Sequence, residues 1–349
     1  MSPRAKDGPK LLAGGDIAIN RAESKGAFGR LIPLLRESDV SFANLELPLY
    51  HGGKPAPEKI LLRGAPEMAG ALAEAGFDVM AFANNHVLDY GEDAFAETMS
   101  LMDSLEIPLV GGGMNLTQAR KPVLIERGGL RVGFLAYCSV IPRGFEATSA
   151  GPGVNPIRAH TSYRPWRDLS EYPGTPPRID TWAEPAHLAR MKRDIRNLKK
   201  KADLVVVNHH WGTSMTHEVM DFEREIAHAT IDAGADLVLG GHPHVLQAIE
   251  FYKGAPIVYS MGNLIFDFDI PFFTDETHDT FLFGCALTKK GVREPYLMPV
   301  TAGVFSKPRL HSPKRGEGRR ITGVMEALNE PFGTNLEVQD DRVLISAPS

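Results

Sequence analysis

The chain has few cysteines and no long hydrophobic run. Its 349 residues include two cysteines, Cys138 and Cys285, far apart and in apolar surroundings. Two such residues do not make the disulfide framework of a small secreted protein. No run of about 18 apolar residues occurs, so we expect no membrane-spanning helix. The start, MSPRAKDGPKLLAGGD, is too poor in apolar residues for a signal-peptide core, which predicts a cytoplasmic protein.

A strong charge of either sign is also missing. The net charge is −5, with 43% hydrophobic and 23% charged residues. This balance gives no general attraction to nucleic acid or anionic lipid, so neither is expected as a partner. The composition is that of a globular protein with a sizeable core, built as one large domain or two ordinary ones.

Helix-like and strand-like segments alternate through the first two-thirds of the chain, which predicts an α/β fold. One helix is indicated by apolar residues at helical spacing from Leu188 to Leu198, after an expected capping box over residues 181–184. A second helix is indicated after Val219, with Gly234 at its C-terminal cap.

Polar side chains stand where strand-like runs end. Five runs finish in carboxylate, amide or imidazole groups, namely Asp16; Asn44 and Glu46; Asn84, Asn85 and His86; Asn208, His209 and His210; His242 and His244. In α/β sheets ligands bind outside the carboxyl ends of the strands. We therefore expect these groups to converge on one site.

Carboxylate, imidazole and amide oxygen together suit divalent metal ions, and a glutamate can bridge two of them. Two ions about 4 Å apart lower the pKa of a water and polarise a phosphoryl or carbonyl oxygen. No thiol joins the set, which argues against a Cys-type structural zinc site. Taken singly, Asp16 is as readily a cap or turn residue, and the run NNH is more readily a turn with a satisfied histidine. Jointly, the groups predict one or two ions per chain (Mn, Fe, Zn or Ca) and no organic cofactor.

Residues 142–183 interrupt the rhythm, because they are rich in proline, glycine, arginine and aromatic residues and lack periodicity. We expect an ordered loop that covers the site and binds an anionic or aromatic part of the substrate. The residues proposed for this contact are Arg143, Arg158, Tyr163, Arg164, Trp166 and Arg167. The alternative, equally weighted, is a surface excursion whose arginines are merely solvated.

The motifs GGD, FANLE, ANNHVLDYG, HHWG, GGHPHVLQAIE and YSMGNLIFDF, over about residues 10–270, resemble the CapA family of poly-γ-glutamate capsule biosynthesis proteins. That family is related to the calcineurin-like metallophosphoesterases. The resemblance implies a four-layer α/β/β/α sandwich with two metals. It assigns Asp16 and His244 to one ion, Asn85, His210 and His242 to the other, and Glu46 as the bridge. It also implies that His86 stabilises or protonates the reacting group, and we expect Asp89 to orient its ring.

The chain departs from this resemblance at several places. Phosphoesterases usually carry a histidine two positions after the first aspartate, where this chain has Ala18. The stretch after HWG lacks an acidic residue, and the N-terminal anchor of many capsule members is not seen. His210 is the preferred ligand because it belongs to HWG, and His209 remains an alternative.

The motifs place a domain over residues 1–300 and an extension over 301–349 that packs on it or trails from it. The favoured function is metal-dependent hydrolysis of a phosphoester or of a peptide or glutamyl amide. The alternatives are a peptide-modifying enzyme such as an epimerase, and a non-catalytic protein of capsule assembly or polymer binding. The substrate is accordingly a peptide, polyglutamate or phosphoester. Further candidates for substrate contact are Arg63, Trp211 and His217.

Overall fold

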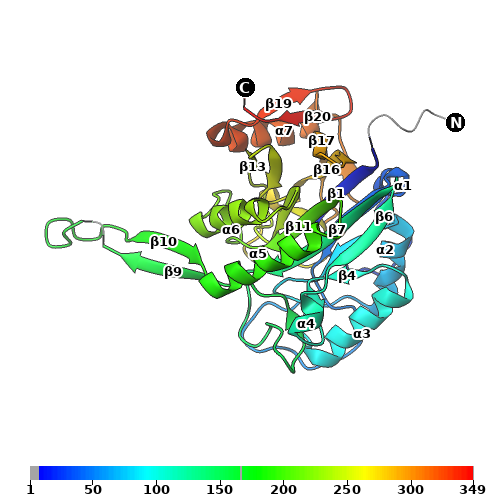
Figure 1. The fold of residues 1–349 in the computed structure, drawn as a ribbon, viewed down its shortest axis with the longest axis horizontal. Coiled ribbons are helices and arrows are strands. Elements are labelled where there is room, and N and C mark those ends of the chain that lie inside the picture. The colour runs from blue at the N-terminus through cyan, green and yellow to red at the C-terminus, as the bar shows by residue number, and fades with distance from the viewer. Residues whose placement is uncertain (1–7, 166, 349) are drawn as a thin grey trace.

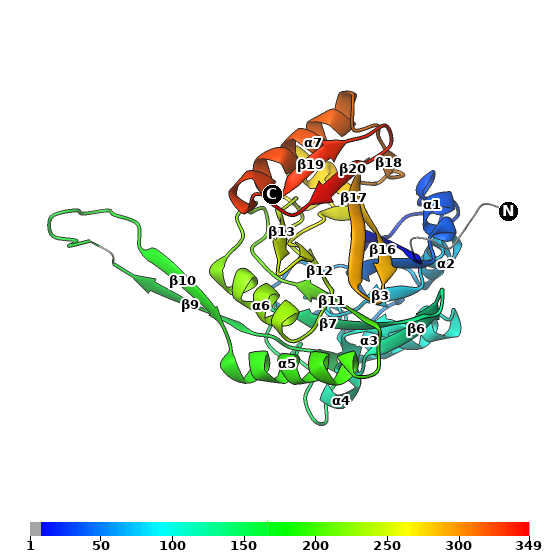
Figure 2. The ribbon, with the colours of Figure 1, turned by 45° about the horizontal axis from the view of Figure 1, so that its top comes forward.

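The computed structural model describes residues 8–165 and 167–348, and two β-sheets packed face to face form its centre (Figure 1). Helices cover the outer side of each sheet, so the layers run helix, sheet, sheet, helix (Figures 1 and 2). The four-layer α/β/β/α sandwich that the family resemblance implies is therefore confirmed.

The first sheet mixes parallel and antiparallel strands. Within the described residues it has ten strands, ordered β19 (Asn335–Val338), β20 (Val343–Ser346), β17 (Gly291–Thr301), β16 (Asp279–Thr288), β1 (Lys10–Ala18), β2 (Val40–Leu45), β3 (Val79–Ala81) and β4 (Leu109–Val110), with β15 (Asn263–Phe266) beside β1 and β18 (Arg309–Leu310) beside β17. Strands β1 to β4 run parallel, so their carboxyl ends share one edge of the sheet.

The second sheet is smaller. Its six strands in the described chain are β13 (Ile249–Tyr252), β14 (Ala255–Val258), β12 (Leu237–Gly241), β11 (Leu204–His210), β7 (Leu130–Cys138) and β6 (Val123–Arg127). The central strands β7, β11, β12 and β14 are parallel. They are buried on both faces, which explains their aliphatic runs without polar alternation.

The two sheets meet through an apolar layer. Phe42 of β2 stacks on Phe134 of β7, with ring centroids 5.7 Å apart. Because side chains alternate along a strand, Val206 and the other even-numbered residues of β11 face this layer. Val207 and the other odd-numbered residues of β11 face the helices. This alternation places the neighbouring residues His209 and His210 on opposite faces of the sheet.

Helices of the outer layers follow the apolar spacing of the sequence. They are α1 (Leu31–Glu37), α2 (Ala69–Ala75), α3 (Gly91–Ser104), α4 (Leu116–Ala119), α5 (Pro185–Lys199), α6 (Asp221–Asp232) and α7 (Gly316–Asn329), with short 3-10 turns at Pro66–Met68, Asp275–His278 and Glu330–Phe332. Helices α5 and α6 confirm the two helices expected from the sequence, and Gly234 has the positive φ of a C-terminal cap, +111°.

The expected capping box over residues 181–184 is wrong. Thr181 lies in strand β10 (Arg178–Ala183), where its hydroxyl accepts the backbone N–H of Phe222. Glu184 is itself the N-cap of α5, because its carboxylate accepts the N–H of Ala186. Thr181 and Glu184 have the three-residue spacing of a capping box, but Thr181 is paired within strand β10 and does not cap the helix.

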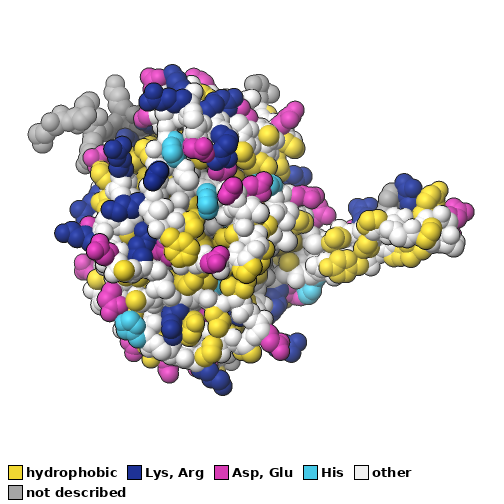
Figure 3. Space-filling view, turned by 180° about the vertical axis from the view of Figure 1, so that it is seen from behind, with side chains coloured by type: hydrophobic (Ala, Val, Ile, Leu, Met, Phe, Trp, Pro, Cys, Tyr) yellow, Lys and Arg dark blue, Asp and Glu magenta, His cyan; other side chains and the backbone are white. Residues whose placement is uncertain are grey.

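The loop expected over residues 142–183 is mostly a hairpin arm. Strand β9 (Ala159–Arg164) pairs antiparallel with β10, and the pair projects from the body (Figures 1 and 2). Its hydrophobic side chains lie exposed along the arm (Figure 3). The earlier part of the segment stays on the body, where β8 (Gly153–Val154) pairs with β5 (Gly112–Gly113).

Residues after 301 are part of the packed structure. Strands β19 and β20 extend the first sheet beyond β17, and α7 packs on β17 and β13. Both cysteines are buried and free. Among the described residues, no helix is long and apolar enough to cross a membrane.

Candidate metal centre

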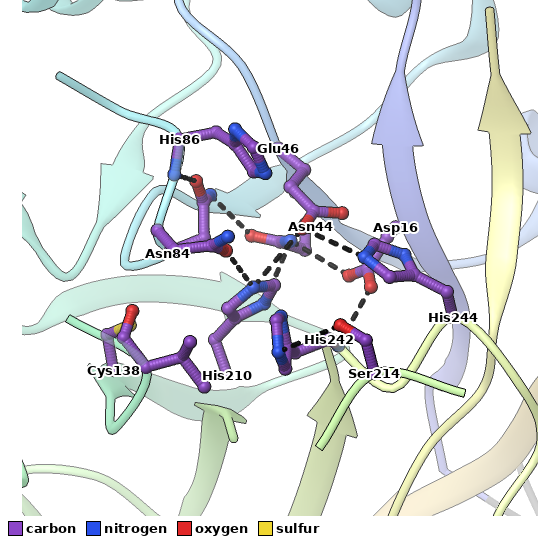
Figure 4. Close-up of polar contacts among 12 residues, drawn as sticks. Asp16, Asn44, Glu46, Asn84, His86, Cys138, His210, Ser214, His242 and His244 are labelled. Carbon is purple, nitrogen blue, oxygen red and sulfur yellow. Dashed lines mark hydrogen bonds and ion pairs between the residues drawn. The ribbon is translucent and has the colours of Figure 1, made fainter. Parts of the chain in front are cut away.

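The polar strand ends of both sheets converge in one buried cluster (Figure 4). Asp16 lies near the end of β1, and Glu46 directly follows β2. His210 is the last residue of β11, and His242 directly follows β12. The carboxyl ends of the parallel strands of the two sheets thus face one another across the sandwich, as the strand-end pattern predicts.

Two overlapping groups of ligand-type side chains make up the cluster. Glu46, His210 and His242 offer ligand atoms within 4.8 Å of one another, and so do Asp16, Glu46 and His244. All five side chains are buried, and Glu46 belongs to both groups. Buried His, Asp and Glu side chains at this spacing can bind a metal ion.

The donor atoms of the cluster are placed for binding a cation and are not satisfied by hydrogen bonds among themselves. Neither carboxylate oxygen of Glu46 accepts a hydrogen bond, and Nδ1 of His242 also lacks a partner. Most buried polar atoms are hydrogen-bonded, so three orphaned atoms at one place call for an explanation. The Nε2 of His210 lies 3.2 Å from Oε1 of Glu46. Two neighbouring ligands of one ion, each about 2.1 Å from it, lie roughly 3 Å apart, so a bound divalent ion would account for the orphaned atoms.

The protonation of the cluster also favours a cation. Burial raises the pKa of Asp16, and burial together with the charge of Asp16 raises the pKa of Glu46 well above its usual value. Burial lowers the pKa of His210 to about 4 and the pKa of His242 well below its usual range. The imidazoles therefore keep a free lone pair, and a bound cation would offset the cost of two buried carboxylates.

Asp16 is fixed by contacts from both sheets. Its Oδ1 accepts a hydrogen bond from Nδ2 of Asn44 at 2.8 Å, and its Oδ2 accepts one from the backbone N–H of His242 at 2.9 Å. Gly241 passes so close that an added Cβ would lie 2.6 Å from Oδ1. The second glycine of GGHPH is therefore required by the carboxylate beside it.

The turn HPH aims its two imidazoles by unusual backbone geometry. His242 and His244 have positive φ angles of +96° and +60°, which L-residues adopt at a cost of about 1–3 kcal/mol each. Nδ1 of His244 donates to Oδ1 of Asn263 at 2.9 Å, since the Asn263 amide group donates elsewhere. The Nε2 lone pair of His244 is thereby directed at the cluster.

Asn85 and His86 point in different directions from the turn after β3. Oδ1 of Asn85 lies 2.8 Å from Nε2 of His210, so both atoms can bond one ion. His86 instead places Nδ1 2.6 Å from Oδ2 of Asp89. Its ring lines an adjoining pocket, which leaves Nε2 for a ligand there. Asp89 thus lies where the sequence analysis expects the orienting partner.

Lys59 completes this side of the site. Its ammonium pairs with Asp89 and lies 3.1 Å from Nδ1 of His86. Burial lowers the pKa of Lys59, although the charge of Asp89 opposes this shift. Burial likewise lowers the pKa of His86 to about 4, again against Asp89, so the free ring is neutral. With Nδ1–H facing Asp89, the neutral ring presents an accepting Nε2 to the pocket.

His209 and Trp211 lie on the opposite face of the second sheet and correct two expectations. Nε2 of His209 lies 3.0 Å from Thr230 of α6, and its ring stacks on Trp211 at 4.6 Å. The indole N–H of Trp211 donates to the carbonyl of Tyr259, and Trp211 is fully buried. His209 is therefore not in the ligand cluster, and Trp211 is a core residue and not a substrate contact.

The other residues expected to contact substrate lie outside the pocket beside the cluster. Arg63 stacks on Tyr90 in a separate pocket of about 250 Å³, and His217 bonds the carbonyl of Leu246. Arg143 is exposed on the body. Arg164 pairs with Asp180 on the arm, and Trp166 lies outside the described residues.

No described residue of the segment 142–183 lines the pocket at the cluster. The expected contact of this segment with a substrate stays a prediction. The side chains that do line it beyond the expected ligands come from elsewhere. Lys59 and Ser214, whose hydroxyl lies 3.3 Å from Nε2 of His242, follow no strand end and were missed. Asn263 stands in the motif YSMGNLIFDF and was recognisable only through that resemblance.

The chain is similar to several known bacterial proteins. A family model described as bacterial capsule synthesis protein PGA_cap matches residues 10–268. The PGA biosynthesis protein CapA of Bacillus subtilis is 33% identical over 264 residues, covering 72% of this chain and 62% of the relative. The capsule biosynthesis protein CapA of Bacillus anthracis is 32% identical, covering 71% of this chain and 56% of the relative. The chain thus spans about three-fifths of the length of these relatives.

More distant similarities extend further along the chain. A probable polyglutamine synthesis accessory protein of Mycobacterium tuberculosis is 27% identical, covering 89% of this chain and 78% of the relative. The crystal structure of a hypothetical protein from Thermus thermophilus is 17% identical with a TM-score of 0.48, covering 83% of this chain and 99% of that one.

Proposed function

The chain belongs to the bacterial capsule synthesis protein family PGA_cap, and from this premise we propose that it is a metal-dependent hydrolase of a peptide or glutamyl amide bond. The observation that carries the proposal is the sharing of Glu46 between the two ligand groups. A carboxylate whose two oxygens accept no hydrogen bond, buried between His244 on one side and His210 and His242 on the other, is suited to bridge two divalent ions.

The residues that would hold the ions follow from the cluster. Asp16 and His244 would share one ion with Glu46, and His210 and His242 would share the other, beside Oδ1 of Asn85. When bound, divalent ions supply Lewis acidity to a substrate oxygen and make water a better nucleophile at neutral pH. Ala18 offers no donor, so the first group has one ligand fewer than in the phosphoesterases that this chain resembles.

His86 supplies the proton transfer. Its neutral Nε2 accepts the proton of the attacking water and returns it to the leaving amine, so the cleaved bond gains one water in total. Asp89 holds Nδ1–H of the ring and stabilises the imidazolium while the proton resides on it. Lys59 holds Asp89 in place from the other side.

Two observations favour an amide over a phosphoester. The relatives are described as proteins of PGA and polyglutamine synthesis, and those polymers are amides. Phosphate groups are commonly bound by arginine forks, and no arginine is among the described residues lining the pocket. Lys59 is the one lysine among these described lining residues, and it is already paired with Asp89.

The test combines metal analysis with a cleavage assay. Purified protein is expected to carry one or two divalent ions and to cleave poly-γ-glutamate or a short peptide, with oxygen from heavy-oxygen water in the new carboxylate. Glu46→Gln should lose both metal and cleavage. His86→Asn should keep its metal and lose about 100-fold to 10,000-fold in turnover. His51→Asn, at an exposed histidine, serves as the control.

Other outcomes would contradict the proposal and point elsewhere. Deuterium uptake at an α-carbon without bond cleavage would identify an epimerase. Tight polymer binding by metal-loaded protein without any turnover would indicate a non-catalytic role in assembly. Release of inorganic phosphate from a phosphoester, with amides untouched, would assign the other hydrolase class.

A further inference from the structure

The pocket beside the ligand cluster is small and one-sided. It has a volume of about 200 Å³ and reaches His242 and His244 at its floor. Pockets for whole drug-sized ligands measure roughly 300–1,000 Å³. The space next to the metal centre therefore admits a single residue of a longer substrate.

One wall of the pocket consists of aliphatic and aromatic side chains. They are Ile60, Leu62, Phe266, Ile270, Phe272 and Phe273. This wall is continuous with the ligand cluster, because the ring of His244 lies 4.9 Å from Phe273 and 5.3 Å from Phe266. A residue placed at the cluster must lie against it.

The wall is only partly covered by the protein itself. Leu62, Phe266 and Ile270 are buried, whereas Phe272 is 49% exposed and Ile60 is 41% exposed. Both exposed side chains line the same pocket, so a single apolar group entering it would remove water from both. Such burial contributes about 25 cal/mol for each Å² of apolar surface.

The pocket has little to offer a carboxylate side chain. Its one cation among the described lining residues is Lys59, whose ammonium is engaged by Asp89. The apolar side chains of the wall offer neither a hydrogen-bond donor nor a positive charge to a carboxylate packed against them. Burying an unpaired carboxylate against this wall would therefore cost free energy.

We infer that the residue bound next to the metal centre carries a large aliphatic or aromatic side chain, and that it packs against Ile60, Phe272 and Phe273. The inference rests on the proposed function, because it takes this pocket as the place of the reacting residue. It narrows the substrate to a peptide with an apolar residue at the reacting position, and it disfavours an unbroken polyglutamate chain.

The test measures binding and needs no turnover. The probes are three N-acetylated tripeptide amides, Ala-X-Ala, with Phe, Leu or Glu as X, titrated into metal-loaded protein by NMR. The Phe and Leu probes should bind at least about 10-fold more tightly than the Glu probe, as expected for burying one large apolar side chain. Tighter or equal binding of the Glu probe overturns the inference, and so does failure of the Phe probe to bind at its solubility limit.

Substitutions at the exposed part of the wall locate the effect. Phe272→Ser and Ile60→Ser replace side chains that are already half in water, so the fold should tolerate them. Each should reduce the preference for the Phe probe several-fold without loss of metal. Leu124→Ser changes a 45% exposed leucine on β6, outside the pocket, and should change nothing. An unchanged preference in both wall variants also overturns the inference.

Failure of the inference can be distinguished from failure of the proposed function. Metal-loaded protein that prefers the Phe probe but cleaves no amide would contradict the hydrolase and leave the side-chain preference standing. Protein that cleaves amides but prefers the Glu probe would do the reverse.

Discussion

His209 and His210 are neighbours on one strand, yet they lie in two different environments. His210 faces the other sheet and joins Glu46 and His242 in the ligand cluster. His209 faces α6, where it stacks between Trp211 and Tyr137. Both are buried, and burial lowers the pKa of His209 to about 3 and that of His210 to about 4. Burial alone therefore does not separate a ligand from a core histidine.

The neighbouring groups distinguish His209 from His210. The hydroxyl of Thr230 donates to the carbonyl of Ile226 at 2.7 Å, so it accepts N–H from Nε2 of His209. No carboxylate contributes to the pKa of His209, whereas Asp16 acts on His210. A histidine of the cluster face meets charge and free oxygens, and a histidine of the helix face meets rings and a hydroxyl. The former can bind a cation, and the latter only packs.

The sharpest test compares these two residues directly. His210→Ala should remove metal and abolish cleavage, because it deletes a ligand next to Glu46. His209→Ala should keep the metal and lower the free energy of unfolding by about 1–3 kcal/mol, through the lost hydrogen bond and packing. Metal analysis and thermal denaturation of both variants check this. Equal metal loss in the two variants would show that the faces are not independent.

The close approach of Gly241 to the carboxylate of Asp16 leads to the next largest expected effect, a loss of metal affinity. Gly241→Ala should displace the carboxylate of Asp16, since the new Cβ would lie 2.6 Å from Oδ1. We expect metal affinity to fall by about 10-fold to 100-fold, as when a residue supporting a ligand is altered. Gly70→Ala, with Ser24 Oγ 3.9 Å from the added Cβ, is the matched control. A titration with metal chelators measures both, and unchanged affinity in Gly241→Ala would refute the steric argument.

The helix face has a pH signature of its own. Burial raises the pKa of Glu223 in α6 to about 8, although the N–H of Met220 donates to the carboxylate. The folded state then holds a proton that the unfolded chain releases near pH 4.5. The free energy of unfolding should therefore fall as pH rises from about 4.5 to about 8, by up to a few kcal/mol.

The variant Glu223→Gln checks this prediction. It should remove most of that fall, because the amide stays neutral and its oxygen can still accept the N–H of Met220. Urea unfolding at a series of pH values measures the slope. A wild-type slope equal to that of Glu223→Gln across this range would show that Glu223 is ionised at no cost in the fold.

The arm should give the smallest effect. Arg164 pairs with Asp180 across the two strands, and Tyr163 is 68% exposed. Arg164→Ala and Tyr163→Ser should leave metal content, turnover and the Michaelis constant unchanged, because neither residue lines the pocket. A raised Michaelis constant with intact metal would instead place the arm in substrate binding. Deleting residues 145–176 would be a poorer test, because Val154 and Asn155 are buried in the body.

Much of the site could be predicted because the ligand candidates lie at or shortly after the carboxyl ends of strands. Asp16, Glu46, His210 and His242 stand at or just after aliphatic runs, and parallel strands bring such ends to one edge. Lys59 could not be found this way, since it lies in an irregular segment and reaches Asp89 only in the folded chain. The apolar wall was missed for the same reason, because Ile60 and Phe272 are brought to one pocket from distant segments.

The hairpin arm could not be predicted from the sequence for a different reason. Its composition is rich in proline and arginine, and its two short strands form a sheet of their own. A hairpin that is mostly exposed needs no apolar periodicity, so the residue pattern does not indicate strands there. Its direction away from the body depends on where β9 and β10 leave the sandwich (Figure 1).

By itself, the sequence determined the alternation of helices and strands, the polar strand ends and the chemistry of their donors, because apolar spacing and residue type are local properties. It left His209 and His210 as alternatives, although a strand must send neighbours to opposite faces. Only the tertiary structure decided which face met the other sheet. Because Phe42 packs on Phe134, the face of β11 that carries His210 lies toward Glu46, and the face that carries His209 lies toward α6. The chemistry of either histidine alone does not determine which face it occupies.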